Sequence, residues 1–148
     1  MGLGHVPQDP FRAEGAGADV QGRQRRGTAE HRDLGDQSRI ARGRWGEDQA
    51  ERWYRNHGYA IVERNWRVKE GEIDLIVAIA GLIVFSEVKT RATDAFGDPS
   101  LAVTNRKQHR LRRLAAIWLR ASNVHGVDVR FDVVCVLGVQ VRVIEDAF

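Results

Sequence analysis

Cysteines and long apolar runs are scarce in this chain, and each absence excludes a class of protein. The single cysteine, Cys135, excludes a disulfide framework and a cysteine-rich metal site within one chain, and it favours a reducing compartment such as the cytoplasm. The apolar stretch that begins at Leu75 is broken by Gly81 and is too short to cross a bilayer, so we expect no membrane association. The N-terminus carries acidic residues and no apolar core, which is unlike a secretory signal.

Lysine is also scarce. Of the 23 basic residues only Lys69, Lys89 and Lys107 are lysines, so each of them calls for an explanation. The chain has 148 residues, of which 43% are hydrophobic and 29% are charged, as in a soluble protein of one ordinary domain. A net charge of +3 and a pI near 9.5 permit a polyanionic partner without proving one.

Residues 1–43 differ from the rest of the chain. They hold two of the three prolines and many glycines, and their apolar residues are isolated, without a period of 2 or 3.6 residues. Such a segment buries too little apolar area to offset the entropy of ordering it. We therefore predict a disordered N-terminal tail over 1–43 and a folded domain over 44–148. The arginines of the tail offer electrostatic contact with nucleic acid, but an extension without function is the favoured interpretation.

From residue 44 onward the pattern is that of alternating helices and strands. Apolar residues spaced as in an amphipathic helix surround Ala50 and Tyr54, and Gly58 ends that helix. A second such helix is predicted over 105–122. The predicted strands cover 59–67, 72–79, 82–90, 128–137 and 139–144. The order α-β-β-β-α-β-β predicts an α/β fold, a mixed sheet flanked by helices, with the nearly all-apolar strand 82–90 at its centre.

Two predicted strands each bring a carboxylate into an apolar setting. If the turn at Gly81 joins them as a hairpin, Asp74 lies beside Glu87, and Lys89 shares a face with Glu87. Two adjacent, partly buried carboxylates repel each other, and Mg²⁺ or Mn²⁺ relieves that repulsion. Lys89 then holds an attacking water or stabilises phosphate charge, as in a phosphodiesterase site. The alternative is an ordinary ion pair at a sheet edge, and this spacing alone does not decide between the two.

Each predicted helix adds one charge at the start of its inward stripe. Glu47 lies one turn before Ala50, and Lys107 precedes Leu111 and Leu114 by one and two turns. Both side chains are placed to reach over the end of the sheet. The alternatives are a carboxylate favoured by the helix dipole for Glu47, and an aliphatic stem with a solvated head for Lys107.

Basic residues also gather outside this candidate site. Arg106, Arg110 and Arg113 form a stripe on the second helix, which is an electrostatic footprint for phosphate, although a solvated helix face explains it equally well. Arg91 follows the site and offers a grip on a phosphate or a surface ion pair. Glu72 lies on the same strand face as Asp74 and competes with it as a ligand, although a place at the strand entrance is favoured.

Seven motifs in a fixed order then make the chain similar to a known family. They are Gly46-Glu47-x-x-Ala50, Glu63-Arg64-Asn65-Trp66-Arg67, Gly71-Glu72-Ile73-Asp74-Leu75-Ile76, Phe85-x-Glu87-Val88-Lys89-Thr90-Arg91, Phe96-Gly97-x-Pro99, Lys107-x-x-x-Leu111 and Arg130-Phe131-Asp132-Val133-Val134. Together they closely resemble the bacterial YraN family. That family is similar to a branch of the restriction-endonuclease-like superfamily near the archaeal Holliday junction resolvases. The resemblance covers the chain from about residue 44 to the C-terminus.

The resemblance implies a metal-dependent nuclease centre. In this superfamily a helix glutamate, a strand aspartate and a Glu-x-Lys strand form that centre. At the matching positions stand Glu47, Asp74, Glu87 and Lys89, and the backbone carbonyl of Val88 is implied as a further metal ligand. Lys107 resembles the basic or amide residue that some members place on the next helix.

The expected function follows from that centre. We expect a Mg²⁺- or Mn²⁺-dependent endonuclease-like protein that hydrolyses phosphodiester bonds in DNA, with branched or damaged DNA as candidate substrates. The alternative is a nucleic-acid-binding module that keeps the fold without cutting. Enzymes that cut junctions usually work as symmetric dimers, so a homodimer is a candidate assembly, although the sequence shows no dimer interface.

Overall fold

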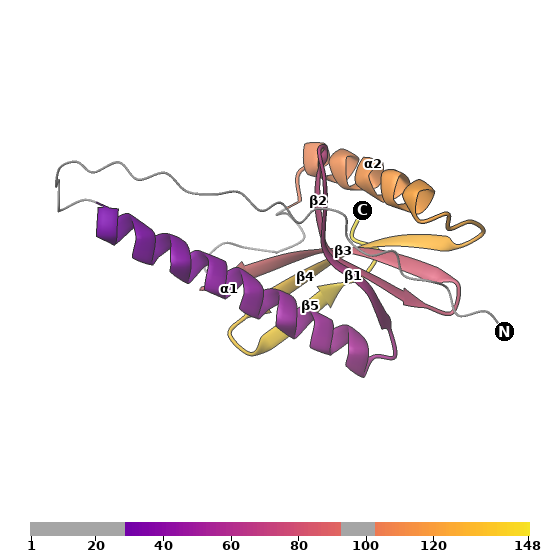
Figure 1. Cartoon of the computed structure of the whole chain (residues 1–148). Helices are drawn as coiled ribbons and strands as arrows, with labels where there is room; N and C mark the ends of the chain where they lie inside the picture. Colours follow the sequence, from indigo (N-terminus) through magenta and orange to yellow (C-terminus); the bar gives the residue numbers. More distant parts are fainter. Residues whose placement is uncertain (1–28, 93–102) are drawn as a thin grey trace, which may run out of the picture.

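The computed structural model describes residues 29–92 and 103–148, and these form one five-stranded sheet with two helices. The motif Phe96-Gly97-x-Pro99 lies outside the described residues. The elements follow the predicted order α-β-β-β-α-β-β (Figure 1). They are α1 (Ala29–Asn56), β1 (Ala60–Val68), β2 (Gly71–Ile79), β3 (Leu82–Arg91), α2 (Asn105–Ala121), β4 (Asp128–Leu137) and β5 (Gln140–Ile144).

The sheet is mixed, with the strand order β1-β2-β3-β4-β5. All neighbours are antiparallel except β3 and β4, which run parallel because α2 lies in the connection between them. β3 is the central strand, as its apolar run predicted. The mixed α/β architecture flanked by helices is therefore confirmed.

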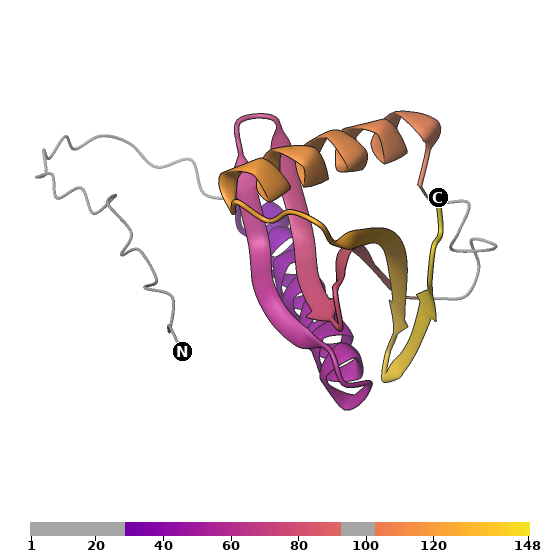
Figure 2. The same cartoon turned by 90° about the vertical axis from the view of Figure 1, so that its right-hand side faces the viewer.

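The two helices cover opposite faces of the sheet (Figures 1 and 2). Ala50 and Tyr54 of α1 pack against alternate residues of β2, β3 and β4, such as Val84. The buried stripe of α2, which includes Leu111 and Trp118, packs on the other face with the intervening residues. Alternation of side chains along each strand places the two apolar clusters back to back. No helix among residues 29–92 and 103–148 is long and apolar enough to span a membrane.

Helix α1 begins well before the predicted domain boundary. It starts at Ala29, so residues 29–43 are helical, and the prediction of a disordered tail up to residue 43 is wrong for them. From Leu34 to Arg42 the side chains are exposed almost throughout, and Leu34 and Ile40 are 65% and 55% exposed. A helix that buries no apolar face carries no periodic signal. Its backbone hydrogen bonds propagate from the packed half of α1, where helix formation has already been nucleated.

Candidate functional site

The site lies where two central strands separate. The antiparallel pairing of β2 with β3 ends at Leu75 and Ser86, whereas the parallel pairing of β3 with β4 continues to Arg91. In Figure 1 the β1–β2 hairpin turns away from β3 at this end of the sheet, toward α2. Asp74 and Glu87 are the next residues beyond the last pair, so the predicted neighbours do stand on adjacent strands where these part.

Asp74 is bonded to the backbone of β3 and is surrounded by other charges. The N–H of Val88 donates to Oδ2 of Asp74 at 2.8 Å. Burial raises the pKa of Asp74 to about 7, and the negative charge of Glu87 acts in the same direction. The charge of Glu47 adds to this increase, whereas the Val88 hydrogen bond and the Lys107 charge oppose it. Near neutral pH this carboxyl is therefore partly protonated, and a bound cation would favour its ionised form.

Glu87 is the most buried acidic group of the site, with 8% of its side chain exposed. Nζ of Lys89 lies 3.1 Å from Oε1 of Glu87. Nζ of Lys107, on α2, contacts the same oxygen. Two of the three lysines of the chain thus meet at one carboxylate, and Lys107 lies inside the site rather than on the exposed face of α2.

The two lysines differ in how firmly they hold their protons. Burial lowers the pKa of Lys107, the hydrogen bond with Lys89 lowers it further, and the net shift is downward in spite of Glu87. Burial also acts to lower the pKa of Lys89, but the hydrogen bond with Lys107 and the charge of Glu87 outweigh burial, so the net shift is upward. The two side chains thus share one carboxylate oxygen in a partly buried cluster.

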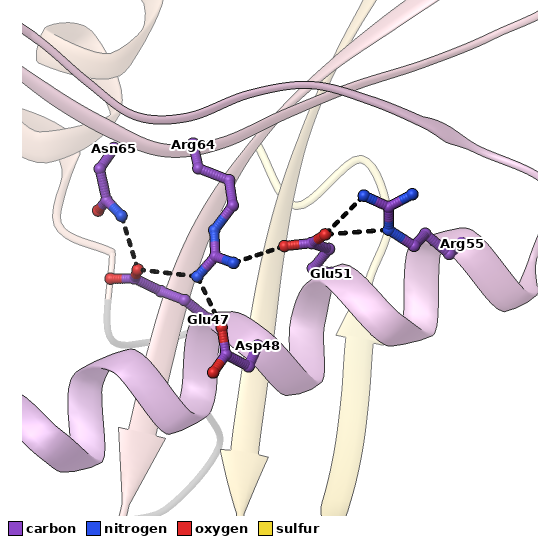
Figure 3. Close-up of polar contacts among 6 residues, drawn as sticks. All are labelled: Glu47, Asp48, Glu51, Arg55, Arg64 and Asn65. Atoms are coloured by element: carbon purple, nitrogen blue, oxygen red, sulfur yellow. Dashed lines mark hydrogen bonds and ion pairs between the residues drawn. The ribbon is translucent and has the colours of Figure 1, made fainter.

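Glu47 is held at its position by β1 (Figure 3). Nδ2 of Asn65 donates to Oε2 of Glu47 at 2.8 Å, and Nη2 of Arg64 lies 3.6 Å from the same oxygen. Arg64 also contacts Asp48 at 2.8 Å and Glu51 at 2.6 Å, so one guanidinium joins three carboxylates of α1. Asn65 has a left-handed backbone with φ of 49°, which asparagine tolerates better than most residues. These contacts fix which way the Glu47 side chain points.

A cavity of about 420 Å³ joins the predicted residues to α1. Its wall includes Glu47, Asp74, Val88 and Lys89, four of the residues that the sequence proposed for one centre. Glu87 is not part of this wall. Thr90 and, from α1, Arg39, Arg42 and Gly43 complete the lining among the described residues.

The close approach of α1 to β3 depends on Gly46. A Cβ atom at Gly46 would lie 1.8 Å from Oγ1 of Thr90 and 3.1 Å from its Cβ. Only glycine therefore lets the helix rest against this end of β3 without displacement. The next residue along the helix is Glu47, so this contact brings its carboxylate to the cavity.

The three arginines of the predicted phosphate stripe lie elsewhere. All of them are exposed on α2, and two of them face a second cavity of about 340 Å³. That cavity is lined by Glu70, His109, Arg110, Arg113 and Leu114, whereas Arg106 is exposed outside it.

Two further candidates lie at strand ends. Arg91 closes β3 opposite Leu137 of β4. Glu72 lies at the start of β2, where its Oε2 is 2.9 Å from Nε of Arg67 and its side chain is 53% exposed. Glu72 is thus engaged at the strand entrance and does not compete with Asp74.

Comparison with known proteins places the chain in a family. Residues 46–136 match the model described as "Uncharacterised protein family UPF0102", which is the YraN family. A UPF0102 protein of Beutenbergia cavernae is 52% identical over 95 residues, which cover 64% of this chain and 80% of the relative. A UPF0102 protein of Rhodococcus opacus is 46% identical over 114 residues, which cover 74% of this chain and 97% of the relative. The chain belongs to the UPF0102 family.

The UPF0102 match includes the carboxylates and lysines of the site but not the whole cavity wall. Arg39 and Arg42 lie before residue 46, where the match begins. Sequence reasoning missed both, because it assigned residues 1–43 to a tail. The available signal was their spacing: Arg39, Arg42 and Gly46 continue, in steps of three and four residues, the stripe that leads to Ala50.

The donor groups of this UPF0102 site suit a hard divalent cation. Mg²⁺ takes oxygen ligands, commonly one or two carboxylates completed by water and phosphate oxygens. Asp74 and Glu87 supply two carboxylates; burial and the charge of Glu87 raise the pKa of Asp74, whereas Glu87 is paired with Lys89 and Lys107. Among residues 29–92 and 103–148, no group of three or more His, Cys, Asp or Glu side chains is arranged around a common metal position. A metal at this site would therefore have two carboxylate ligands.

Proposed function

We propose that this UPF0102 protein is a Mg²⁺- or Mn²⁺-dependent endonuclease that hydrolyses phosphodiester bonds in DNA. The observation that carries the proposal is the juxtaposition of Asp74 and Glu87 where β2 and β3 part, beside two lysines. Like charges crowd together there, and the pKa of Asp74 rises to about 7 through burial and the neighbouring carboxylates. Such repulsion destabilises the folded state unless a positively charged ligand binds there and relieves it.

In this proposal Asp74 and Glu87 hold the metal, with the carbonyl of Val88 as the further ligand that the family resemblance implies. A bound Mg²⁺ supplies Lewis acidity and lowers the pKa of water in its coordination shell. The protein contributes orientation. The Val88 N–H fixes one oxygen of Asp74, and Asn65 with Arg64 fixes Glu47 at the cavity wall.

The lysines supply positive charge. Lys89 lines the cavity and remains protonated, so its ammonium is placed to stabilise the negative charge that grows on a phosphate during hydrolysis. Lys107 brings a second positive charge to Glu87 from α2. Binding of a metal by Glu87 would require this carboxylate to give up its contacts with both lysines.

The contact between Glu87 and the two lysines also favours a second candidate, a DNA-binding module that does not cut. In that case Lys89 and Lys107 neutralise Glu87 permanently, and the cluster is a buried ion pair rather than a ligand set. The two candidates differ in one respect: only the nuclease needs Glu87 to exchange its lysine partners for a metal.

A nuclease assay separates them. Linear, flapped and four-way-junction DNA is incubated with the protein and Mg²⁺ or Mn²⁺, and nicking is followed on gels. We expect wild-type protein to nick at least one substrate and Glu87→Gln and Asp74→Asn to lose nicking. Lys89→Ala should keep metal binding but slow turnover by about a hundredfold or more.

The matched control is Glu72→Gln. It removes an exposed carboxylate near the start of β2, where Glu72 pairs with Arg67 outside the site. This variant should nick like the wild type. Normal nicking by a folded Glu87→Gln protein would reject the nuclease assignment, and DNA binding by a wild-type protein that nicks none of the substrates would favour the non-cutting module.

A further inference from the structure

The N-terminal half of α1 forms one wall of the candidate active-site cavity. Figure 1 shows this half of the helix projecting past the sheet, whereas the C-terminal half packs on it. Arg39, Arg42 and Gly43 belong to the projecting half, and all three line the cavity together with Asp74 and Lys89. The projecting helix is therefore in place beside the reacting groups, although it contributes nothing to the apolar core.

Helical geometry explains why these arginines face the cavity. Residues spaced by three or four lie on one side of a helix, so Arg39 and Arg42 share the face of Gly46 and Ala50. Gly46 rests on Thr90 at the end of β3, and Ala50 is fully buried on the sheet. At a rise of about 1.5 Å per residue, Arg42 and Arg39 lie about 6 and 10 Å from Gly46 along the helix axis, toward the N-terminus of α1. The sheet-facing stripe thus becomes basic where the helix leaves the sheet.

The guanidinium groups of Arg39 and Arg42 are not paired with the carboxylates of the cavity. Glu47 bonds to Asn65 and lies near Arg64, and Asp74 accepts the N–H of Val88. Within residues 29–92 and 103–148, neither of the two arginines forms a salt bridge. Both are exposed. Two cations on the rim of a cavity therefore remain available for a ligand.

We propose that Arg39 and Arg42 clamp the phosphate backbone of the nucleic-acid strand that enters the cavity. The inference rests on the proposed function, because it assumes that the strand is the substrate of the Asp74–Glu87 centre. Arginine suits this role, since its planar guanidinium donates two parallel hydrogen bonds to a phosphate. The phosphates of a nucleic-acid strand follow one another at a regular spacing, so two arginines one turn apart on α1 are placed to contact successive phosphates. Such contacts do not depend on the base sequence.

The test compares two double variants of one helix. Arg39→Ala with Arg42→Ala removes the cavity-facing charges, and Arg44→Ala with Arg52→Ala removes the same charge from exposed positions of α1 outside that cavity. Binding to a fluorescein-labelled 30-base-pair duplex and to a labelled four-way junction is measured by anisotropy in EDTA over a series of salt concentrations. Circular dichroism verifies that each variant is folded, and nicking of the same DNA is measured with Mg²⁺.

We expect the cavity pair to weaken binding to both probes by about tenfold or more and to lower the slope of log K against log salt by about 1.8, or 0.9 per lost contact. The control pair should change affinity less than about threefold. Equal losses in the two double variants would overturn the clamp, because they would show a general charge effect. A wild-type protein that binds neither probe would overturn it as well.

The clamp and the nuclease fail separately. If wild-type protein nicks DNA and the cavity pair leaves affinity, salt slope and nicking unchanged, the clamp is wrong and the nuclease stands. If wild-type protein binds without nicking and the cavity pair weakens binding as expected, the nuclease is wrong and the backbone clamp stands. Arg39→Lys with Arg42→Lys should retain the salt slope, since charge is kept, but recover only part of the affinity because the paired donors are lost.

Discussion

Asp132 and Asp74 are both aspartates of the central sheet, yet their surroundings differ in how fully they are paired. Asp132 is completely buried and accepts two hydrogen bonds from Arg130, each of 2.8 Å. The Tyr54 hydroxyl donates to Oδ2 at 2.8 Å, and the N–H of Asp146 donates to Oδ1 at 3.1 Å. Both oxygens and the negative charge of Asp132 are thus satisfied within the fold.

Asp74 has a much poorer set of partners. It accepts the N–H of Val88 and lies near the like charges of Glu87 and Glu47, which the charges of Lys107 and Lys89 oppose only in part. The comparison teaches that burial of a carboxylate does not by itself indicate a functional site. A fully bonded carboxylate stabilises a unique packing, whereas one left among like charges at the wall of a cavity gains stability only from a proton or a cation.

The largest expected effect is on stability, and the two aspartates should respond in opposite directions. Asp132→Asn removes the closest ionic partner of Arg130, which among the described residues then keeps only Glu145 at 3.6 Å, and it should lower the free energy of unfolding by about 3–5 kcal/mol. Asp74→Asn removes one of two repelling charges and should leave that free energy unchanged or raise it at pH 8. Urea denaturation of the metal-free proteins measures both. If Asp74→Asn lowered the free energy of unfolding by several kcal/mol, Asp74 would be a structural residue, and the contrast between the two aspartates would be wrong.

The next effect concerns metal. At about one hundred times its dissociation constant, Mn²⁺ should raise the free energy of unfolding of the wild type by about 2.7 kcal/mol, because it binds the folded state. Asp74→Asn and Glu87→Gln should show no such increase, whereas Glu72→Gln should show all of it. Thermal melting with and without Mn²⁺ at pH 8 gives these values. An equal increase in all four proteins would place the cation elsewhere.

A gradual effect, spread over about three pH units, should appear in the pH dependence of the metal-free protein. The pKa of Asp74 lies at about 7 in the folded state and near 3.8 in the unfolded chain, so the folded state binds the proton more tightly. The stability from this proton is complete below about pH 4 and is lost as the pH rises through 7, with a slope of at most about 1.4 kcal/mol per pH unit. The difference in stability between Asp74→Asn and wild type should therefore grow with pH between 4 and 7. A constant difference would contradict the raised pKa.

How far the sequence predicts this molecule depends on whether a contact is local. The strands over 82–90 and 128–137 and the helix over 105–122 agree with the structure, because apolar alternation and glycine turns act within a few residues. The neighbourhood of Asp74 and Glu87 was also predictable, since a hairpin turned at Gly81 brings them to the same level. The start of α1 was not predictable, because its first half buries no stripe.

Contacts that cross between elements were harder to predict. Lys107 meets Glu87 only because α2 packs against β3 at a particular depth, and no spacing in the sequence encodes that depth. Asn65 and its neighbour Arg64 both contact carboxylates of α1, although simple alternation would place neighbouring side chains on opposite faces; the left-handed backbone of Asn65, with φ of 49°, interrupts the alternation there. The sequence thus indicated the chemical groups of the site, while tertiary packing decided their partners.

The smallest expected effect tests whether the two clusters are independent. Tyr54→Phe removes the hydroxyl that donates to Asp132 and lies 2.6 Å from Oγ of Ser86, and it keeps the ring that packs on the sheet. Loss of one buried hydrogen-bonding group should lower the free energy of unfolding by about 1–2 kcal/mol, less than Asp132→Asn because Arg130 still neutralises the carboxylate.

Tyr54→Phe should also keep the full stabilisation by Mn²⁺, since the hydroxyl bonds to Asp132 and Ser86 and not to the Asp74 centre. Tyr59→Phe is the matched control: its hydroxyl accepts a hydrogen bond from Arg130 at 3.0 Å at a less buried position, so its cost should be smaller. Urea denaturation with and without Mn²⁺ measures both variants. If Tyr54→Phe abolished the Mn²⁺ effect, the two aspartates would belong to one coupled network, because a change confined to the Asp132 cluster would then control cation binding at Asp74.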